Sequence, residues 1–329
     1  MKKYFILVFY LISFIAFGQI IHKRKLSMLG SPFEITVVAK DTAEANQFED
    51  MAIIEVKRIE NVISDWIPTT PVSEINRNSG KQAVKVPQEL IELIERSIKI
   101  SKLTEGAFDI SYASMDKIWK FDGSMVAMPS AEAIKQSVAK VGYQKIIIDK
   151  DKQTIMLKEE GMKLGLGGIG QGYIADKLKE LLISKGCVSG LVNVSGDIST
   201  WGKQPNGEQW KVGIINPMNK NKIFATFPLE DTAVETSGSY EKYVIFNGKR
   251  YSHIIDTRTG YPATGLISVS IFAKTTELAD ALATGVFVLG KDIGMDLVNQ
   301  LPGIGCIMVD EEGKISSSKK IDLKKYSHE

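Results

Sequence analysis

Gly165-Leu166-Gly167-Gly168-Ile169-Gly170-Gln171-Gly172 stands between a predicted strand over Met162–Leu166 and a predicted helix over Ile169–Lys185. Its spacing satisfies G-x-G-x-x-G, the fingerprint of a dinucleotide-binding βαβ unit. The strand before it, however, is reached through the tight charged turn Lys158-Glu159-Glu160-Gly161, which makes that strand antiparallel to its neighbour. A doubly wound fold also needs further alternating strands and helices. The stretch therefore favours a helix packed on an antiparallel sheet.

The rest of the chain supports this class, because predicted strands and helices occur in separate blocks. Apolar residues recur at helical spacing in four other segments, namely Thr42–Trp66, Pro87–Leu103, Glu277–Leu289 and Asp292–Asn299. Short strands are predicted at His22–Met28, Phe33–Ala39, Lys145–Asp149, Thr154–Lys158, repeatedly between Val188 and Phe272, and at Gly305–Val309 and Lys314–Ser318. We therefore expect an α+β fold.

The N-terminus has the pattern of a targeting segment. Lys2 and Lys3 precede the apolar run Tyr4–Phe17, which ends in small residues before Gln19, as in a secretory signal peptide. The run is short for a hydrocarbon core of about 30 Å. We therefore expect residues 1–18 to be a signal peptide cleaved near Gly18, with export to the periplasm; retention as an inner-membrane anchor is the alternative.

Composition and charge exclude several classes of protein. Hydrophobic residues make up 44% and charged residues 24% of the 329 residues, which excludes a wholly disordered or collagen-like chain. Without the signal peptide, Lys+Arg falls from 41 to equal the 39 Asp+Glu. A neutral chain gives no electrostatic reason to expect nucleic acid as a partner.

The cysteine content excludes a disulfide framework or a Cys-rich zinc site, because there are two cysteines. Cys187 and Cys306 lie in the apolar contexts GCVSGLV and IGCIMV, so we expect two buried free thiols. Export would permit a disulfide, and the sequence leaves the pairing open.

Two glycine-containing segments carry polar chemistry. The stretch from Gly165 places backbone N–H groups at a helix N-terminus, where a phosphate can bind; close packing of helix on sheet is the alternative use of its glycines. Asn193-Val194-Ser195-Gly196-Asp197 runs from a strand into a turn, so Asp197 either closes a plain turn or marks a polar site at a strand end.

Two further segments offer a base and hard ligands. His253 is the one histidine far from the termini, and Asp256, Arg258 and Thr259 follow it closely, a pattern suited to anion or metal–phosphate work; a histidine satisfied within the core is the alternative. Asp280 and Thr284 lie one turn apart on one face of a helix. Their oxygens suit Mg²⁺ better than zinc, unless they only stabilise their own helix.

Taken together, ordered motifs from Met28 to Gly290 resemble those of the periplasmic FAD:protein FMN transferases, the ApbE family. No single motif is specific, but this number in this order is. The segments that carry the resemblance are Met28-Leu29-Gly30-Ser31; Ser64-Asp65-Trp66 and Ser73-Glu74-Ile75-Asn76; Glu105 to Ser111 and Trp119-Lys120-Phe121; Leu166 to Asp176; Asn193 to Ile198; Thr236 to Tyr240; His253 to Pro262; and Ala279 to Thr284.

The resemblance implies a fold and an activity. The fold would be twisted antiparallel sheets with flanking helices, similar to the tunnelling fold, over residues 19–329, with a helical insert around residues 104–140 beside an FAD-binding cleft. The reaction would be Mg²⁺-dependent transfer of FMN from FAD to a Thr or Ser hydroxyl of an acceptor protein, with release of AMP. The acceptors would be flavoprotein subunits of exported or membrane redox complexes.

The resemblance also implies roles for individual residues. Asp280, Thr284 and the Gly170 carbonyl would hold Mg²⁺, and His253, the second catalytic candidate beside Asp280, would take the acceptor proton or stabilise the leaving phosphate. Met28 and Trp66 would sandwich the isoalloxazine. The other implied FAD contacts are Asn76, Asp109, Ser111, Gly167, Gly168, Gln171, Asp197, Ser237, Arg258 and Thr259.

Some positions depart from the family pattern. Gln171 stands where the family usually has Lys, so a charge facing the phosphate is missing, and Ser239 replaces Asp. Three other functions stay open at this stage: an FAD pyrophosphatase giving FMN and AMP, an oxidoreductase that uses the G-x-G-x-x-G stretch, and a periplasmic FAD-binding protein without catalysis. The missing βαβ series argues against the oxidoreductase.

Overall fold

An antiparallel sheet of eight strands forms the centre of the molecule. The computed structural model describes residues 18–239 and 242–327, so most of the predicted signal peptide lies outside the described residues. The strand order is β1-β2-β6-β7-β10-β13-β14-β15. Their bounds are β1 Ile20–Met28, β2 Ser31–Ala39, β6 Gly190–Val194, β7 Asp197–Trp201, β10 Ala233–Gly238, β13 Leu266–Ala273, β14 Gly305–Asp310 and β15 Ile315–Ser317.

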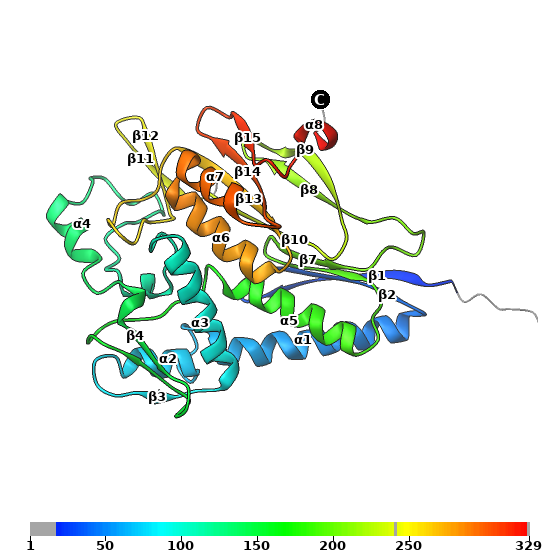
Figure 1. Cartoon of the computed structure of the whole chain (residues 1–329), viewed down its shortest axis with the longest axis horizontal. Coiled ribbons are helices and arrows are strands. Elements are labelled where there is room, and N and C mark those ends of the chain that lie inside the picture. Colours follow the sequence, from blue (N-terminus) through cyan, green and yellow to red (C-terminus); the bar gives the residue numbers. More distant parts are fainter. Residues whose placement is uncertain (1–17, 240–241, 328–329) are drawn as a thin grey trace, which may run out of the picture.

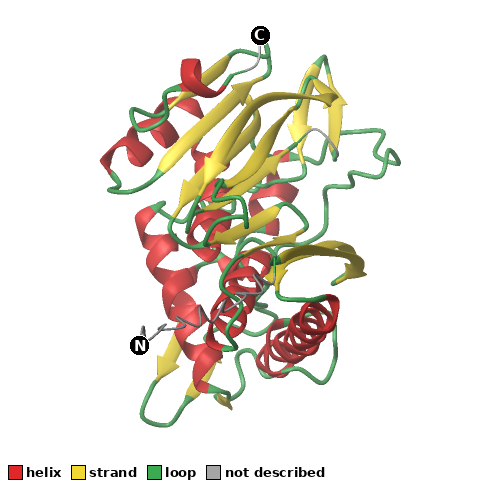
Figure 2. Cartoon of the chain, turned by 90° about the vertical axis from the view of Figure 1, so that its right-hand side faces the viewer, coloured by secondary structure: helices red, strands yellow, loops and turns green. Residues whose placement is uncertain are grey.

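Four helices cover one face of this sheet (Figure 1). They are α1 Thr42–Ile63, α5 Gly170–Ser184, α6 Thr276–Leu289 and α7 Lys291–Gln300. The opposite face is covered by the hairpin of β8 Trp210–Asn216 and β9 Asn219–Leu229, with α8 Leu323–Tyr326 beside it. Because both faces are covered, β13 is buried at every position, and its sequence is almost continuously apolar. Figure 2 shows the separation of helices and strands from another side.

A smaller unit packs against one end of this layer (Figure 1). Its sheet has the order β3-β5-β4, formed by Val84–Lys85, Thr154–Leu157 and Ile146–Asp149. The helical pieces around it are α2 Pro71–Arg77, α3 Gln88–Leu103, the 3₁₀ helices η1 Ile110–Ser114 and η2 Tyr143–Lys145, and α4 Ala131–Ser137. A separate hairpin consists of β11 Tyr243–Phe246 and β12 Lys249–Ser252.

The predicted α+β class is confirmed, since every strand pair in the described residues is antiparallel. The first hairpin also forms as predicted. Its turn is Leu29-Gly30, with φ of 56° and 69°, the left-handed conformation that a two-residue hairpin turn requires at both positions. Cys187 and Cys306 are both free and buried, also as predicted.

Two predicted elements differ from the structure. The first helix ends at Ile63 rather than Trp66, because Ser64 adopts an extended conformation and its hydroxyl accepts hydrogen bonds from the backbone N–H groups of Trp66 and Ile67. Residues 162–166 form no strand. The side chains of Asn76 and Ser114 bind the backbone of Leu164 and Lys163 instead, while β3 occupies the free edge of β5.

The segment from residue 104 to 140 contains η1 and α4, joined by residues without regular structure. It packs against the loop after β12: the Trp119 indole N–H donates to the Gly260 carbonyl, and the Trp119 ring stacks on Tyr251. This contact forms one wall of the site described below. Within the described residues, the structure contains no helix with the length and apolar character of a membrane span.

Candidate active site

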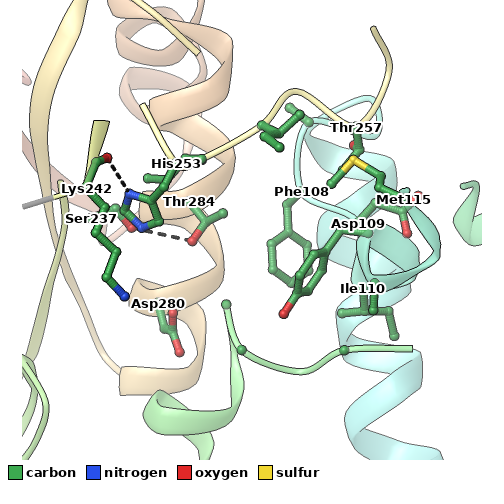
Figure 3. A pocket seen from close by; sticks show the side chains of 18 of the residues that line it. Phe108, Asp109, Ile110, Met115, Ser237, Lys242, His253, Thr257, Asp280 and Thr284 are labelled. Carbon is green, nitrogen blue, oxygen red and sulfur yellow. Dashed lines mark hydrogen bonds between the residues drawn. The ribbon is translucent and has the colours of Figure 1, made fainter. Parts of the chain in front are cut away.

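A cavity of about 630 Å³ lies between α6, β10 and the segment around η1. In Figure 3, Asp280 and Thr284 project from α6 on one side, and Phe108, Asp109 and Ile110 lie on the other. Nine residues predicted for the site line this cavity: Asp109, Gly167, Gly168, Gln171, Asp197, Ser237, His253, Asp280 and Thr284. Segments far apart in the sequence therefore converge here, at a volume typical of small-molecule sites.

The glycine stretch forms the floor of the cavity at the N-terminus of α5. The residue before α5 provides no side-chain cap, so the positive end of the helix dipole at this floor can favour a bound anion. Two of the first N–H groups already have partners: the Gly170 N–H binds the Leu166 carbonyl, and the Gly172 N–H binds Asp280. Gly167 and Gly168 line the cavity, and a Cβ at Gly167 would lie 2.9 Å from the Tyr112 hydroxyl. Close packing is one use of these glycines, because a Cβ at Gly172 would lie 2.4 Å from the Thr276 carbonyl oxygen. Phosphate binding by this stretch stays a prediction.

Three buried carboxylates meet beside this floor. One oxygen from each of Asp197, Glu235 and Asp280 lies within 4.8 Å of the others. Asp280 accepts a hydrogen bond from the Gly172 N–H at 3.1 Å. Within residues 18–239 and 242–327, Asp197 Oδ1 and Glu235 Oε2 are buried and have no hydrogen-bond partner. Unpartnered buried carboxylate oxygens are costly, so the cluster has the chemistry of an oxygen-ligand cation site.

The electrostatics of this cluster follow from burial and mutual repulsion. Burial raises the pKa of Asp280 to about 7. Burial also raises the pKa of Asp197 well above its usual range, and the negative charges of Asp280 and Glu235 add to the shift. The pKa of Glu235 is raised in the same way, by burial and then by Asp280. A divalent cation would reverse these shifts by stabilising the charged forms.

Hydroxyl groups and a histidine complete the cavity. The Ser237 hydroxyl lies 3.4 Å from Glu235 Oε1 and 3.4 Å from the Thr284 hydroxyl. His253 Nδ1 lies 3.2 Å from the Lys242 carbonyl oxygen (Figure 3). Because a carbonyl only accepts, Nδ1 carries the proton in this contact, so Nε2 is the basic nitrogen whenever the ring is neutral.

A smaller hollow of about 220 Å³ adjoins the cavity and shares Gly167 and Gln171 with it. Trp66 and Gly170 line this hollow. Trp66 is 81% exposed, and the Lys117 ammonium lies 5.3 Å from its ring centre. Met28 lines neither space and packs on the core instead, whereas its neighbour Leu29 lines the hollow.

Four predicted contacts lie outside both spaces and bind the chain itself. Asn76 holds both backbone groups of Leu164. Ser111 donates to Asp109 and accepts from the Gly142 N–H. Arg258 forms two hydrogen bonds with Asp256, and the Thr259 hydroxyl accepts from the Tyr261 N–H. In this structure these residues shape the walls rather than face the cavity.

The lining residues that were not predicted include Glu235, Tyr112 and Lys242. The sequence did contain a signal for Glu235. It lies two residues before Ser237 in a strand, and residues two apart share a face of a sheet. Tyr112 belongs to the short 3₁₀ helix η1 and Lys242 to an irregular segment, and neither is long enough or regular enough to show a periodic pattern in the sequence.

The fold and the cavity define a class of α+β protein with an anion-binding helix N-terminus beside a buried acidic cluster. The sequence matches the ApbE family over residues 29–308, and the chain belongs to that family. It is 29% identical to the FAD:protein FMN transferase of Treponema pallidum over 91% of this chain and 87% of that one.

Solved structures agree with this assignment. The chain is similar to the ApbE protein of Thermotoga maritima, with a TM-score of 0.83 and 30% identity over 94% of this chain and 100% of that one. It is also similar to the flavinyl transferase ApbE of Pseudomonas stutzeri in its apo form, with a TM-score of 0.81 and 26% identity over 92% and 95% of the two chains.

Proposed function

We propose that this protein is a Mg²⁺-dependent FAD:protein FMN transferase, which attaches FMN to a Thr or Ser hydroxyl of an acceptor protein and releases AMP. The observation that carries the proposal is one cavity in which the N-terminus of α5 adjoins the carboxylate of Asp280 and the hydroxyl of Thr284. Relatives of similar length carry the name FAD:protein FMN transferase.

The reaction would exchange one P–O bond for another. The acceptor hydroxyl oxygen bonds to the phosphorus of the FMN half of FAD, the bridging P–O bond of the pyrophosphate breaks, and AMP leaves with the bond electrons. His253 Nε2 would take the hydroxyl proton, since its Nδ1 is held by the Lys242 carbonyl. The N–H groups of Gly167 and Gly168 would hold pyrophosphate oxygens.

The donor set fits a magnesium ion. Asp280, Thr284 and neighbouring carboxylates offer only oxygen, and two buried carboxylate oxygens lack a partner. Bound Mg²⁺ would neutralise charge on the phosphates during transfer. Asp280 is itself positioned by the Gly172 N–H, so the anion-binding floor and the cation ligand keep a fixed separation.

The location of the reaction is part of the proposal. The N-terminal pattern over residues 1–18 supports export to the periplasm, where exported and membrane flavoproteins would be the acceptors. Mass spectrometry of the mature protein from its native host should find an N-terminus near Gln19. An intact Met1 on membrane-bound protein would contradict cleavage.

The activity is tested by incubating the purified protein with FAD, Mg²⁺ and a peptide that contains a flavinylation sequence. Covalent fluorescence on the peptide in a denaturing gel, with equimolar AMP, is the expected result. Free FMN and AMP without labelled peptide would identify an FAD pyrophosphatase instead. Binding of FAD without turnover would leave only an FAD-binding protein.

A further inference from the structure

Glu235 is not needed for any bond-making or bond-breaking step of the proposed reaction, yet its carboxylate is buried beside Asp280 in the cavity. It lies on β10, next to Asp197 at the start of β7 and Asp280 on α6. Its Oε1 accepts one long hydrogen bond from Ser237, at 3.4 Å, and its Oε2 has no partner. A buried acid so poorly satisfied requires an explanation.

Three buried carboxylates this close repel one another strongly unless protons or a cation neutralise them. The Gly172 N–H serves only Asp280. The unpartnered oxygens of Asp197 and Glu235 belong to the same cluster. A cation would supply both oxygens with the partner that they lack, whereas two shared protons would leave an acidic pocket without metal affinity. The first explanation therefore predicts that the protein binds a divalent cation at this cluster, and the second predicts that it does not.

We propose that Glu235, together with Asp197, adds carboxylate ligands to Asp280, so that this centre binds a divalent cation before FAD arrives. The inference deepens the proposed function, on which its relevance to flavin transfer rests. A site built from Asp280, Thr284 and one carbonyl carries a single negative charge, and it would need phosphate oxygens to hold the ion. Three carboxylates carry enough charge to hold it without the substrate.

The test is a titration of the metal-stripped, FAD-free full chain with Mn²⁺, followed by the EPR signal of free Mn²⁺. Wild-type protein is expected to bind Mn²⁺ without FAD, and Glu235→Gln to bind it at least about tenfold more weakly. The matched control is Glu49→Gln. Glu49 is also fully buried and one of its oxygens lacks a hydrogen bond among the described residues, but it lies on α1, 2.7 Å from His22 and 3.8 Å from Arg24, so its variant should bind Mn²⁺ as the wild type does.

Wild-type affinity in Glu235→Gln, or no Mn²⁺ binding by FAD-free wild-type protein, would overturn the inference. Circular dichroism checks that each variant is folded. If Glu235→Gln fails to fold, Asp197→Asn takes its place, with the same expected loss of affinity and the same overturning result.

A flavin-transfer assay keeps the two proposals separate. Mn²⁺ binding that depends on Glu235, in a protein that transfers no FMN, would contradict the proposed function and leave the metal centre standing. If the wild-type protein transfers FMN and Glu235→Gln binds Mn²⁺ as tightly as wild type, the proposed function stands and the role of Glu235 in the metal centre is contradicted.

Discussion

Buried and partly buried carboxylates occur in two settings in this protein, and their hydrogen bonds differ. Asp176 accepts from the N–H groups of Thr276 and Glu277, both at 2.8 Å, at the N-terminus of α6. Asp109 accepts from the Ser111 N–H and hydroxyl and from the Tyr143 N–H.

In the acidic cluster, by contrast, Asp197 and Glu235 each retain an oxygen without a partner. Burial alone therefore does not separate a structural acid from a ligand. The number of hydrogen-bond donors that the protein supplies to a carboxylate distinguishes the two. A carboxylate whose oxygens already accept hydrogen bonds from the protein has few lone pairs left for a cation.

The largest expected effect is at Asp280. Asp280→Ala should lower Mg²⁺-dependent flavin transfer by on the order of 10³-fold, since it removes the charge that compensates the ion. The measurement is AMP release at saturating FAD, with circular dichroism to confirm the fold. Thr284→Ala is the milder comparison, because water can partly replace a neutral ligand. Full activity of Asp280→Ala would remove this residue from the site.

Asp176 should behave in the opposite way. Asp176→Ala leaves two backbone N–H groups of α6 without their acceptor, at a cost of about 1–3 kcal/mol in the free energy of unfolding. Urea denaturation measures this loss. Turnover of the folded variant at saturating Mg²⁺ should stay within a few-fold of wild type. A variant of normal stability that cannot turn over would erase the distinction between the two kinds of acid.

The acidic cluster also predicts how stability depends on pH. The pKa values of Asp197, Glu235 and Asp280 are raised in the folded protein, that of Asp280 to about 7, above unfolded values of about 4. The folded state therefore binds more protons, and the metal-free protein should lose stability as the pH rises from about 4 through 7.

Glu235→Gln removes one source of this repulsion. The melting temperature of the metal-free variant should exceed that of wild type above neutral pH by a few degrees, and the order should reverse when saturating Mg²⁺ is added. Scanning fluorimetry with and without Mg²⁺ measures both. Equal pH profiles for the two proteins would show that the cluster is not under electrostatic strain.

The smallest expected effect is at Gln171, which lines both the cavity and the adjoining hollow. Gln171→Lys places a positive charge at the N-terminus of α5, near the pyrophosphate. It should leave FAD affinity unchanged and either raise turnover or lower the Mg²⁺ concentration for half-maximal rate. A loss of FAD affinity of about tenfold or more would identify Gln171 as a specific hydrogen-bonding ligand.

Local patterns predicted the frame of the molecule well. Helical spacing located α1, α3, α5 and α6 within a few residues, and antiparallel pairing followed from short turns between strands. The error at residues 162–166 has a clear cause: the backbone there bonds to Asn76 and Ser114, which are distant in sequence. The local sequence pattern does not show hydrogen bonds to residues that are distant in the chain.

The candidate site was predictable where motifs carried it, and the structure brings those segments to one cavity. The sequence was less informative about whether a given polar side chain faces the cavity or binds other groups of the protein. Asn76 and Arg258 are polar and lie in segments that carry the family resemblance. Asn76 nevertheless forms hydrogen bonds with the backbone of Leu164, and Arg258 forms them with the side chain of Asp256. Glu235 was overlooked because a single acid in a strand is conspicuous only once its neighbours in space are known.

Gly172 joins the two halves of the site without a side chain. Its N–H binds Asp280, and a Cβ at this position would lie 2.4 Å from the Thr276 carbonyl oxygen and 2.9 Å from Asp280 Cβ. Helix α5 and helix α6 therefore pack closely at Gly172, where a hydrogen bond joins the backbone of α5 to the Asp280 side chain of α6. An added methyl group here would push the two helices apart and shift the cation ligand relative to the amides, although every ligand would stay chemically intact.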